Sequence, residues 1–198
     1  MKKLTLLFVF LAFSLVNINV SAQDSHRSSR WRWTIDDIFN PEETPFAIGH
    51  RGFGENLGEV ENHPIENTAR AVRRAYREGI KIVEVDVVLT RDNRVVALHD
   101  DYLDDFTCVN TLTYRQLKRR VRHVSSLRQI LFMAHIFSYQ WRIDSPGGLV
   151  IVEIKTPSPL CDPDDTGSAP LVNKVNRVIN RTRMKNQVLI ESFSPEIM

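Results

Sequence analysis

The chain has 198 residues, of which 42% are hydrophobic, and it carries 26 Lys and Arg against 24 Asp and Glu. This length fits one domain with a sizeable core. The small net charge of +2 gives no sign of a surface for nucleic acid, so no nucleic-acid partner is expected. Residues 1–22 contain two of the basic residues and none of the acidic ones, which leaves the rest of the chain formally neutral.

Residues 1–22 are predicted to be a secretory signal peptide. Lys2 and Lys3 precede an uncharged apolar run over residues 4–16, and Val20-Ser21-Ala22 offers small residues at a cleavage position. An uncleaved anchor is the alternative, but the run is shorter than the roughly 20 apolar residues that a membrane span needs. We therefore expect an exported protein, periplasmic or extracellular.

Residues 23–44 form an N-terminal extension, and the folded domain is expected over residues 45–198. The extension contains the cluster Trp31-Arg32-Trp33. A basic aromatic segment can rest on a membrane surface, which would be a peripheral membrane contact. We favour a helix or plug that packs against the floor of the domain.

Apolar residues alternate with a period of two in several segments, which is typical of β-strands. Segment 80–87 divides into two faces, with Val83, Val85 and Val87 on one and Ile82, Glu84 and Asp86 on the other. In a parallel α/β barrel the first face packs under helices and the second points inward. Two carboxylates at the inner rim are costly to bury without a cation, so this strand predicts a metal ion.

Two more segments repeat the pattern, and each carries a functional group at its last inward position. In 94–100 the inward residues are predicted to be Val95, Ala97 and His99, with Val96 and Leu98 outward. In 149–155 the inward residues are Leu149, Ile151, Glu153 and Lys155, with Val150, Val152 and Ile154 outward. Residues 46–48 are the first predicted strand, leading into His50, and residues 188–193 are a fifth.

Helical patterns fill the gaps between these strands, as a βαβ architecture requires. Helices are predicted over residues 68–78, from Thr113 through Val121, over 125–139 and over 169–184. Asn67 or Thr68 would cap the first helix and Gly79 would end it. The predicted fold class is therefore α/β, of the barrel type in which catalytic groups meet at the carboxyl ends of the strands.

Three carboxylates at predicted strand ends, Glu84, Asp86 and Glu153, make an oxygen-rich site suited to Mg²⁺ or Ca²⁺. Zinc is disfavoured because no close pair of histidine or cysteine ligands accompanies them. His50 and His99 would stand on opposite sides of the ion, where two imidazoles can divide the work of general base and general acid.

Arg51 and Lys155 are suited to phosphoryl oxygens, Arg51 through its planar fork and Lys155 as a point charge. Together with a metal ion and two histidines, they favour displacement at a phosphodiester, where developing negative charge must be neutralised.

These residues, in this order and spacing, resemble the glycerophosphodiester phosphodiesterase family. The motifs run from about residue 48 to the end of the chain: His50-Arg51-Gly52, Glu66-Asn67-Thr68, Glu84-Val85-Asp86-Val87, Thr90-Arg91-Asp92, His99-Asp100, Glu153-Ile154-Lys155 and Ser192-Phe193. The resemblance implies a TIM (β/α)₈ barrel of the phospholipase C-like type. It also implies hydrolysis of glycerophosphodiesters, small-molecule substrates, to glycerol 3-phosphate and an alcohol with a bound divalent cation.

The resemblance further assigns roles to individual residues. The acid/base pair would be His50 and His99, the metal ligands Glu84, Asp86 and Glu153, the phosphate contacts Arg51 and Lys155, and the orienting residues at the same rim Glu66 and Asn67. The link from Gly52 to Glu66 is longer than in compact bacterial members, which affects the substrate-facing loop.

The number of predicted strands falls short of a complete barrel. An eightfold barrel typically has about 250 residues, whereas five strands are predicted here, so we expect a domain that is incomplete at its C-terminus. The chain is then either a fragment of a longer protein or a truncated form. Two other functions stay open: a phospholipase D-like activity on lysolipids or sphingolipids, and an inactive binding protein on a truncated barrel.

Cys108 and Cys161 follow the third and fourth predicted strands, so both belong to loops at the active rim. In an exported protein they can form a disulfide, and two free thiols are the equal alternative. Neither cysteine is expected to act in catalysis, because no base is placed beside it.

Overall fold

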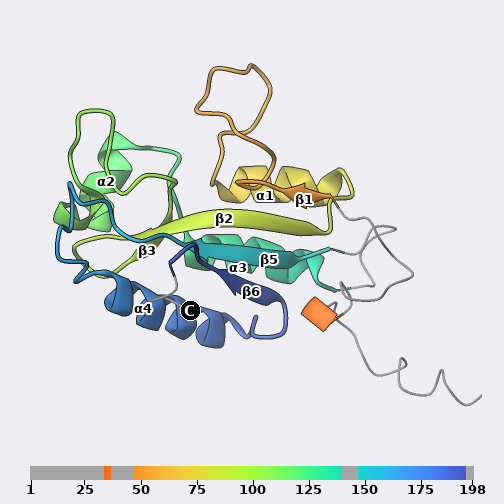
Figure 1. Ribbon diagram of the computed structural model, residues 1–198. Helices are drawn as coiled ribbons and strands as arrows, with labels where there is room; N and C mark the ends of the chain where they lie inside the picture. The colour runs from red at the N-terminus through yellow and green to blue at the C-terminus, as the bar shows by residue number, and fades with distance from the viewer. Residues whose placement is uncertain (1–33, 37–46, 140–146, 195–198) are drawn as a thin grey trace, which may run out of the picture. The chain divides into compact units, whose positions relative to one another are not determined.

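The computed structural model describes residues 34–36, 47–139 and 147–194. Six strands within these residues form one mixed sheet in the order β4-β3-β2-β5-β6, with β1 added to β2 (Figure 1). The strands are β1 (Ile48–Gly49), β2 (Ile82–Leu89), β3 (Val95–Ala97), β4 (Ser125–Ser126), β5 (Leu149–Ile154) and β6 (Val188–Glu191). The pairs β1–β2, β2–β5 and β5–β6 are parallel, whereas β3 runs antiparallel to β2 and β4.

Four α-helices and one short 3₁₀-helix connect the strands. They are α1 (Ala69–Arg77), the 3₁₀-helix η4 (Val109–Thr111), α2 (Tyr114–Arg120), α3 (Leu127–Phe137) and α4 (Ser168–Thr182). The side chains of Thr68, Thr113 and Ser126 accept hydrogen bonds from backbone N–H groups in the first turns of α1, α2 and α3. All four predicted α-helices are therefore confirmed, although α3 begins after Ser126 because residues 125–126 pair with β3 as β4.

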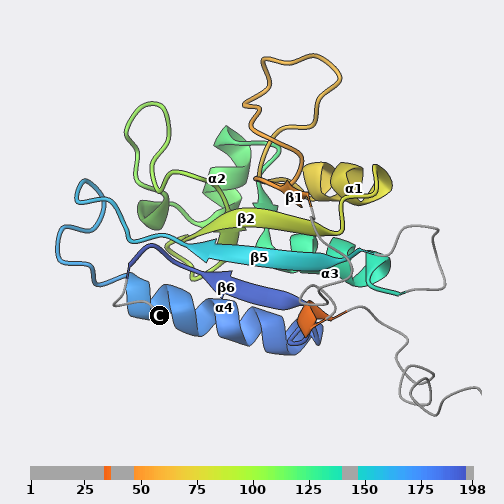
Figure 2. The same cartoon turned by 45° about the vertical axis from the view of Figure 1, so that its right-hand side comes forward.

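The large hydrophobic core lies between the sheet and three helices. Val83, Val85 and Val87 of β2 face this core, as predicted, together with the alternate residues of β5. Against them pack apolar side chains of α1, α3 and α4, which cover one side of the sheet (Figures 1 and 2). The period-two pattern of β2 and β5 thus sorted their two faces correctly.

The opposite face of β2 and β5 starts apolar and becomes charged toward the carboxyl ends. Ile82 and Leu149 pack together with Ile35 and Ile151 at the start of the strands. Glu84, Asp86 and Glu153 follow on the same face, and all three are buried. Parallel pairing places Asp86 beside Glu153, so the register of the sheet brings these carboxylates together.

The prediction of an inward-facing parallel strand over 94–100 is wrong. Residues 90–94 close a tight hairpin in which the Thr90 N–H donates to the Arg94 carbonyl oxygen (3.0 Å) and Asn93 adopts a positive φ of 59°. β3 therefore runs back along β2, with Ala97 opposite Val87. An antiparallel partner shares the face of the residue that it opposes.

The faces of β3 are consequently the reverse of those predicted. Val95 and Ala97 lie in the large core, and Val96 and Leu98 join a smaller cluster with Val88 beside α2. His99 is not part of the strand; it lies in a bend that follows.

The predicted signal peptide and N-terminal extension fall almost wholly outside the described residues, and both stay predictions. In the described part of the chain, no helix combines the length and the hydropathy needed to cross a bilayer.

Tyr76 links α1 to the sheet through a single buried hydrogen bond. Its hydroxyl donates to the carbonyl oxygen of Leu149 at 2.8 Å, and the side chain is 1% exposed. We predict that Tyr76→Phe lowers the free energy of unfolding by about 1–2 kcal/mol, because a buried carbonyl loses a partner. Urea denaturation followed by circular dichroism measures this change.

Tyr114→Phe is the matched control, because its hydroxyl donates to Gln129 at the surface. It should change the free energy of unfolding by less than about 0.5 kcal/mol. Equal effects of the two substitutions would contradict the role assigned to Tyr76.

Candidate active site

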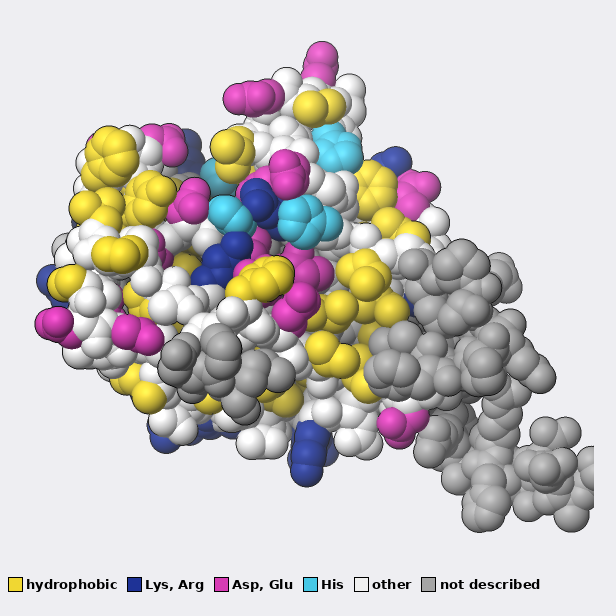
Figure 3. All heavy atoms as spheres, viewed as in Figure 1, with side chains coloured by type: hydrophobic (Ala, Val, Ile, Leu, Met, Phe, Trp, Pro, Cys, Tyr) yellow, Lys and Arg dark blue, Asp and Glu magenta, His cyan; other side chains and the backbone are white. Residues whose placement is uncertain are grey.

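The candidate active site lies on the charged face of the sheet, where β1, β2 and β5 end. His, Lys or Arg, and Asp or Glu side chains gather at the centre of this face (Figure 3). All nine residues predicted from the sequence belong to it: His50, Arg51, Glu66, Asn67, Glu84, Asp86, His99, Glu153 and Lys155. Their contacts show how each is held.

The tight turn at His50-Arg51-Gly52 follows β1 and lies beside Glu84 of β2. Arg51 and Gly52 have positive φ angles of 50° and 94°. This shape directs the Arg51 backbone N–H to the Glu84 carboxylate (2.8 Å) and the Gly52 N–H to the Glu84 carbonyl oxygen (2.9 Å). A Cβ on Gly52 would lie 2.9 Å from that of Ala71, so glycine is required there.

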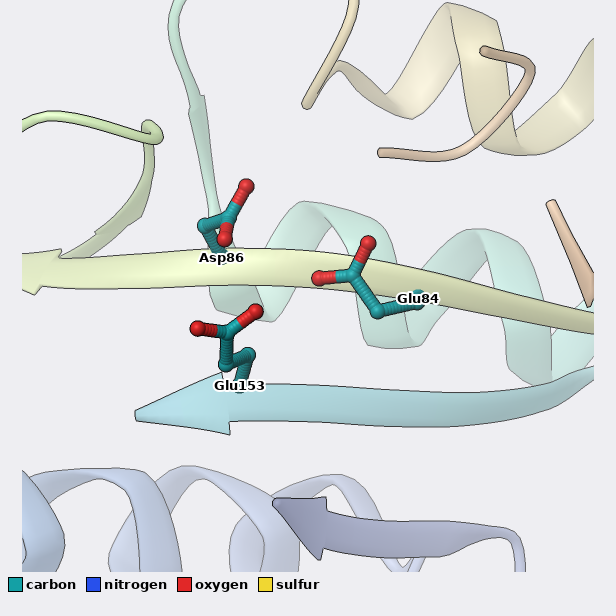
Figure 4. Close-up of side chains that lie close together, drawn as sticks. All are labelled: Glu84, Asp86 and Glu153. Carbon is teal, nitrogen blue, oxygen red and sulfur yellow. The ribbon is translucent and has the colours of Figure 1, made fainter. Parts of the chain in front are cut away.

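Glu84, Asp86 and Glu153 form a compact carboxylate cluster. One oxygen of each lies within 4.8 Å of the others, and the three side chains point toward one another from β2 and β5 (Figure 4). Among the described residues, nothing donates a hydrogen bond to the buried oxygen Glu84 Oε1, and Asp86 Oδ1 has only the Lys155 ammonium, at 3.1 Å. Buried anionic oxygens without donors are what an oxygen-binding divalent cation would coordinate, so the cluster fits Mg²⁺ or Ca²⁺.

Two cations border the carboxylate cluster. Arg51 forms an ion pair with Glu66 (2.9 Å) and lies 3.5 Å from Asp86. Lys155 Nζ lies 3.1 Å from Asp86 Oδ1 and 3.4 Å from Glu153. Glu66 and the three cluster carboxylates carry four negative charges against these two positive ones, so the site retains an excess of negative charge that a divalent cation would neutralise.

The pKa values of two of these carboxylates are raised by burial and by their neighbours. Burial raises the pKa of Glu84 from its usual 4.5 to about 7; the charges of Asp86 and Glu153 add to this rise, and the Arg51 N–H opposes it. Burial and the Asp86 charge also raise the pKa of Glu153, against the effect of Lys155. Without a cation, the protonated and ionised forms of Glu84 would therefore both be populated near pH 7.

Asn67 and Glu66, predicted to orient the site, contact its charged groups. The Asn67 side chain donates to Asp86 Oδ2 (2.9 Å) and accepts from the Asp86 backbone N–H (3.0 Å). Its φ of 52° lies in the left-handed region that Asn tolerates better than most residues. Glu66 binds Arg51 with one oxygen and the Asn56 N–H (3.1 Å) with the other.

The two histidines lie in different loops, and His50 is the one with a contact to the cluster. His50 Nε2 lies 3.9 Å from Glu84, and its Nδ1 lies 3.6 Å from Glu55. His99 Nδ1 lies 3.0 Å from Asp100 Oδ1. Each imidazole thus has a carboxylate on its Nδ1 side.

His99 separates two hollows on this rim. A groove of about 470 Å³ is lined by His99 together with Arg51, Glu66 and Asn67. A cavity of about 550 Å³ is lined by His99 together with Lys155. Either hollow has the size of a small-molecule site.

Sequence reasoning missed two residues that support the site. Glu55 faces both His50 and Arg51, with 3.9 Å between its carboxylate and the Arg51 guanidinium. Asn56 is 5% exposed and accepts hydrogen bonds from the N–H groups of Gly58 and Val60. An Asn followed two residues later by Gly signals a turn, and that signal could have identified Asn56.

The two cysteines, left open by the sequence, form a disulfide. Cys108 and Cys161 are bonded with their Cα atoms 5.4 Å apart. The bond joins the loop that contains His99 to the loop that follows Lys155.

The chain is similar to proteins of one family. The sequence model of the glycerophosphoryl diester phosphodiesterase family matches residues 50–198. A glycerophosphodiester phosphodiesterase of Bacillus altitudinis is 39% identical over 76 residues, which are 36% of this chain and 28% of that protein. Another, of Caldanaerobacter subterraneus, is 34% identical over 77 residues, covering 37% and 29%.

Solved structures share the fold. A glycerophosphodiester phosphodiesterase from Parabacteroides distasonis aligns with a TM-score of 0.58 at 22% identity, over 76% of this chain and 57% of that one. An Oleispira antarctica phosphodiesterase, solved in complex with the product sn-glycerol-3-phosphate, gives 0.58 at 21% identity, over 77% and 59%. The predicted α/β barrel fold class is confirmed. The chain spans under a third of these curated relatives and under three fifths of these structures.

The raised pKa of Glu84 predicts a pH-dependent stability of the metal-free protein. Because the pKa is about 7 when folded and near 4.5 otherwise, the free energy of unfolding falls as pH rises from about 4.5 to about 7. Glu84→Gln cannot ionise, so at pH 8 it should be more stable than the wild type by about 1–2 kcal/mol after allowance for solvent screening. Near pH 4.5 the two should agree. Thermal unfolding in EDTA at each pH measures the difference.

The exposed Glu59 supplies the control. Glu59→Gln should follow the wild-type profile at every pH. If the free energy of unfolding of Glu84→Gln changed with pH in parallel with that of the wild type, the surroundings of Glu84 would not raise its pKa.

Proposed function

Because this chain belongs to the glycerophosphoryl diester phosphodiesterase family, we propose that it hydrolyses glycerophosphodiesters to glycerol 3-phosphate and an alcohol. The observation that carries the proposal is the buried cluster of Glu84, Asp86 and Glu153, in which Glu84 Oε1 has no donor among the described residues. His50, Arg51 and Lys155 border this cluster. The Bacillus altitudinis relative bears the name of this activity, and the Oleispira antarctica neighbour was solved with sn-glycerol-3-phosphate. These names support the substrate class.

In the proposal, Glu84, Asp86 and Glu153 hold a divalent cation, Mg²⁺ or Ca²⁺. When bound, this ion supplies positive charge to the phosphoryl oxygens as the negative charge on them develops. Arg51 and Lys155 contact the same phosphate, because both border the cluster. Glu66 orients the Arg51 guanidinium, and Asn67 orients Asp86.

His50 and His99 share the proton transfers. One imidazole takes a proton from the attacking water as its oxygen bonds to phosphorus, and the other donates a proton to the leaving alcohol oxygen as the P–O bond breaks. Glu55 beside His50 and Asp100 beside His99 stabilise the imidazolium forms.

A second substrate class has its own support. The groove beside Arg51 has an apolar lining that includes Leu57, Leu98 and Leu103. Such a lining suits the acyl chain of a lysolipid, as a phospholipase D-like activity would require. The choice between the two substrates is an outcome of the experiment below.

We predict hydrolysis of glycerophosphocholine in Mg²⁺ or Ca²⁺ and its loss in EDTA. His50→Ala and His99→Ala should each lower kcat by about 100-fold or more, because each removes a proton-transfer group. Glycerol 3-phosphate release, measured by a coupled assay on the full chain, gives both results. Faster turnover of lysophosphatidylcholine than of glycerophosphocholine would favour the lysolipid class.

His135→Gln is the control, because His135 lies on α3, away from the rim. It should retain wild-type kcat. Correctly folded protein that binds Mg²⁺ without turning over either substrate would favour the inactive binding protein instead.

We also propose that the protein is exported. The apolar run after Lys2 and Lys3 supports this, and the disulfide suits an oxidising compartment. We predict that the secreted product begins at Gln23, since cleavage would follow Ala22. N-terminal sequencing of the secreted form tests this, and a product that retains residue 1 would contradict it.

A further inference from the structure

Two loops on the rim of the candidate site are joined to each other, and each carries one residue of the site. One loop follows β3 and contains His99, and the other leads from Lys155 to α4. The Cys108–Cys161 disulfide connects them. Beside it, the Asn110 side-chain amide donates to the Cys161 carbonyl oxygen (2.9 Å).

Asp101 makes a second connection between the same loops. Its carboxylate oxygen Oδ2 accepts a hydrogen bond from the backbone N–H of Ser158 at 2.8 Å. Its own carbonyl oxygen accepts from the N–H of Val109 at 2.7 Å, which closes the first loop on itself. Asp101 thus lies at the centre of the contact and reaches both loops.

The connections lie close to the chemistry along the chain. Asp101 is two residues from His99, and Ser158 is three residues from Lys155. All four residues line the same cavity of about 550 Å³, and Cys161 lies in its wall. The hydrogen bond between Asp101 and Ser158 therefore restrains the loops next to His99 and Lys155.

We propose that Asp101 is a positioning residue, which together with the Cys108–Cys161 disulfide fixes His99 relative to Lys155; this role rests on the proposed function. We call this pair of connections the rim clamp. The metal carboxylates lie on β2 and β5, which the sheet holds without the rim clamp. Loss of the clamp should therefore spare ion binding and impair the placement of the phosphate.

The experiment compares two substitutions of Asp101 in the full chain. Asp101→Ala removes the acceptor for Ser158, and we expect kcat for glycerophosphocholine to fall by about 10-fold or more, because small misplacements of catalytic groups are costly. Asp101→Asn keeps an acceptor oxygen and should retain most of the activity. The Mn²⁺ dissociation constant should stay within about twofold in both variants. The positioning role would be overturned if Asp101→Ala and Asp101→Asn lost equal fractions of kcat, or if the affinity for Mn²⁺ fell as much as kcat.

Asp164→Ala is the matched control, since Asp164 is an exposed aspartate of the second loop. It should behave like the wild type. The double variant Cys108→Ser with Cys161→Ser should resemble Asp101→Ala. If the double variant does not fold, the wild type with its disulfide selectively reduced, as verified by thiol titration, replaces it. Full activity after disulfide removal would exclude the disulfide from the clamp.

A readout that does not use turnover separates this inference from the proposed function. We expect hydrogen exchange in Asp101→Ala to quicken in both loops, and inorganic phosphate in the presence of Mn²⁺ to bind about 10-fold more weakly. These changes would support the clamp even if the wild type turned over no diester. Faster exchange in the first loop alone, with unchanged phosphate affinity, would refute it.

Discussion

The structure depends on the burial of three carboxylates on one face of a sheet whose other face is a hydrophobic core. Burying a charge costs several kcal/mol unless partners replace its water. Here the Arg51 N–H donates a hydrogen bond to Glu84, and the Asn67 side chain donates one to Asp86. Lys155 lies beside Asp86 and Glu153. These partners leave an excess of formal negative charge, and Glu84 Oε1 has no donor among the described residues. A divalent cation would neutralise this excess charge, so the free-energy cost of burying the carboxylates would be the physical basis of the proposed ion binding.

The sequence predicted the parts of the site that follow from strand periodicity. Glu84, Asp86 and Glu153 alternate with core-facing residues of β2 and β5, so their common face could be inferred before their distances were known. The helix caps at Thr68 and Thr113 were equally local signals. What a strand presents at every second residue depends only on backbone geometry, which explains why this part succeeded.

The features that the sequence left wrong, open or unseen involve contacts between segments far apart or turns that reverse the chain. The alternation around Val96 looks the same in a parallel strand and in a hairpin, and only the turn at Thr90–Arg94 decides between them. Cys108 and Cys161 are separated by 53 residues, so their pairing depends on how two loops meet. The support of His50 by Glu55 likewise depends on the path of a loop that no periodicity describes.

The difference between strands and loops explains why the loops that carry His99 and Lys155 need additional bonds to hold them. Residues inside β2 and β5 are fixed by ladder hydrogen bonds on neighbouring strands, whereas His99 and Lys155 lie just beyond the last paired residues. Beyond the ends of the strands no inter-strand hydrogen bonds fix the backbone. Motion of these loops would therefore displace the groups proposed to contact the phosphate. A covalent bond that closes a loop of this length removes much of the freedom of both segments. In the proposed mechanism the sheet thus positions the carboxylates that would bind the ion, and the bonds between loops position the groups that would act on the substrate.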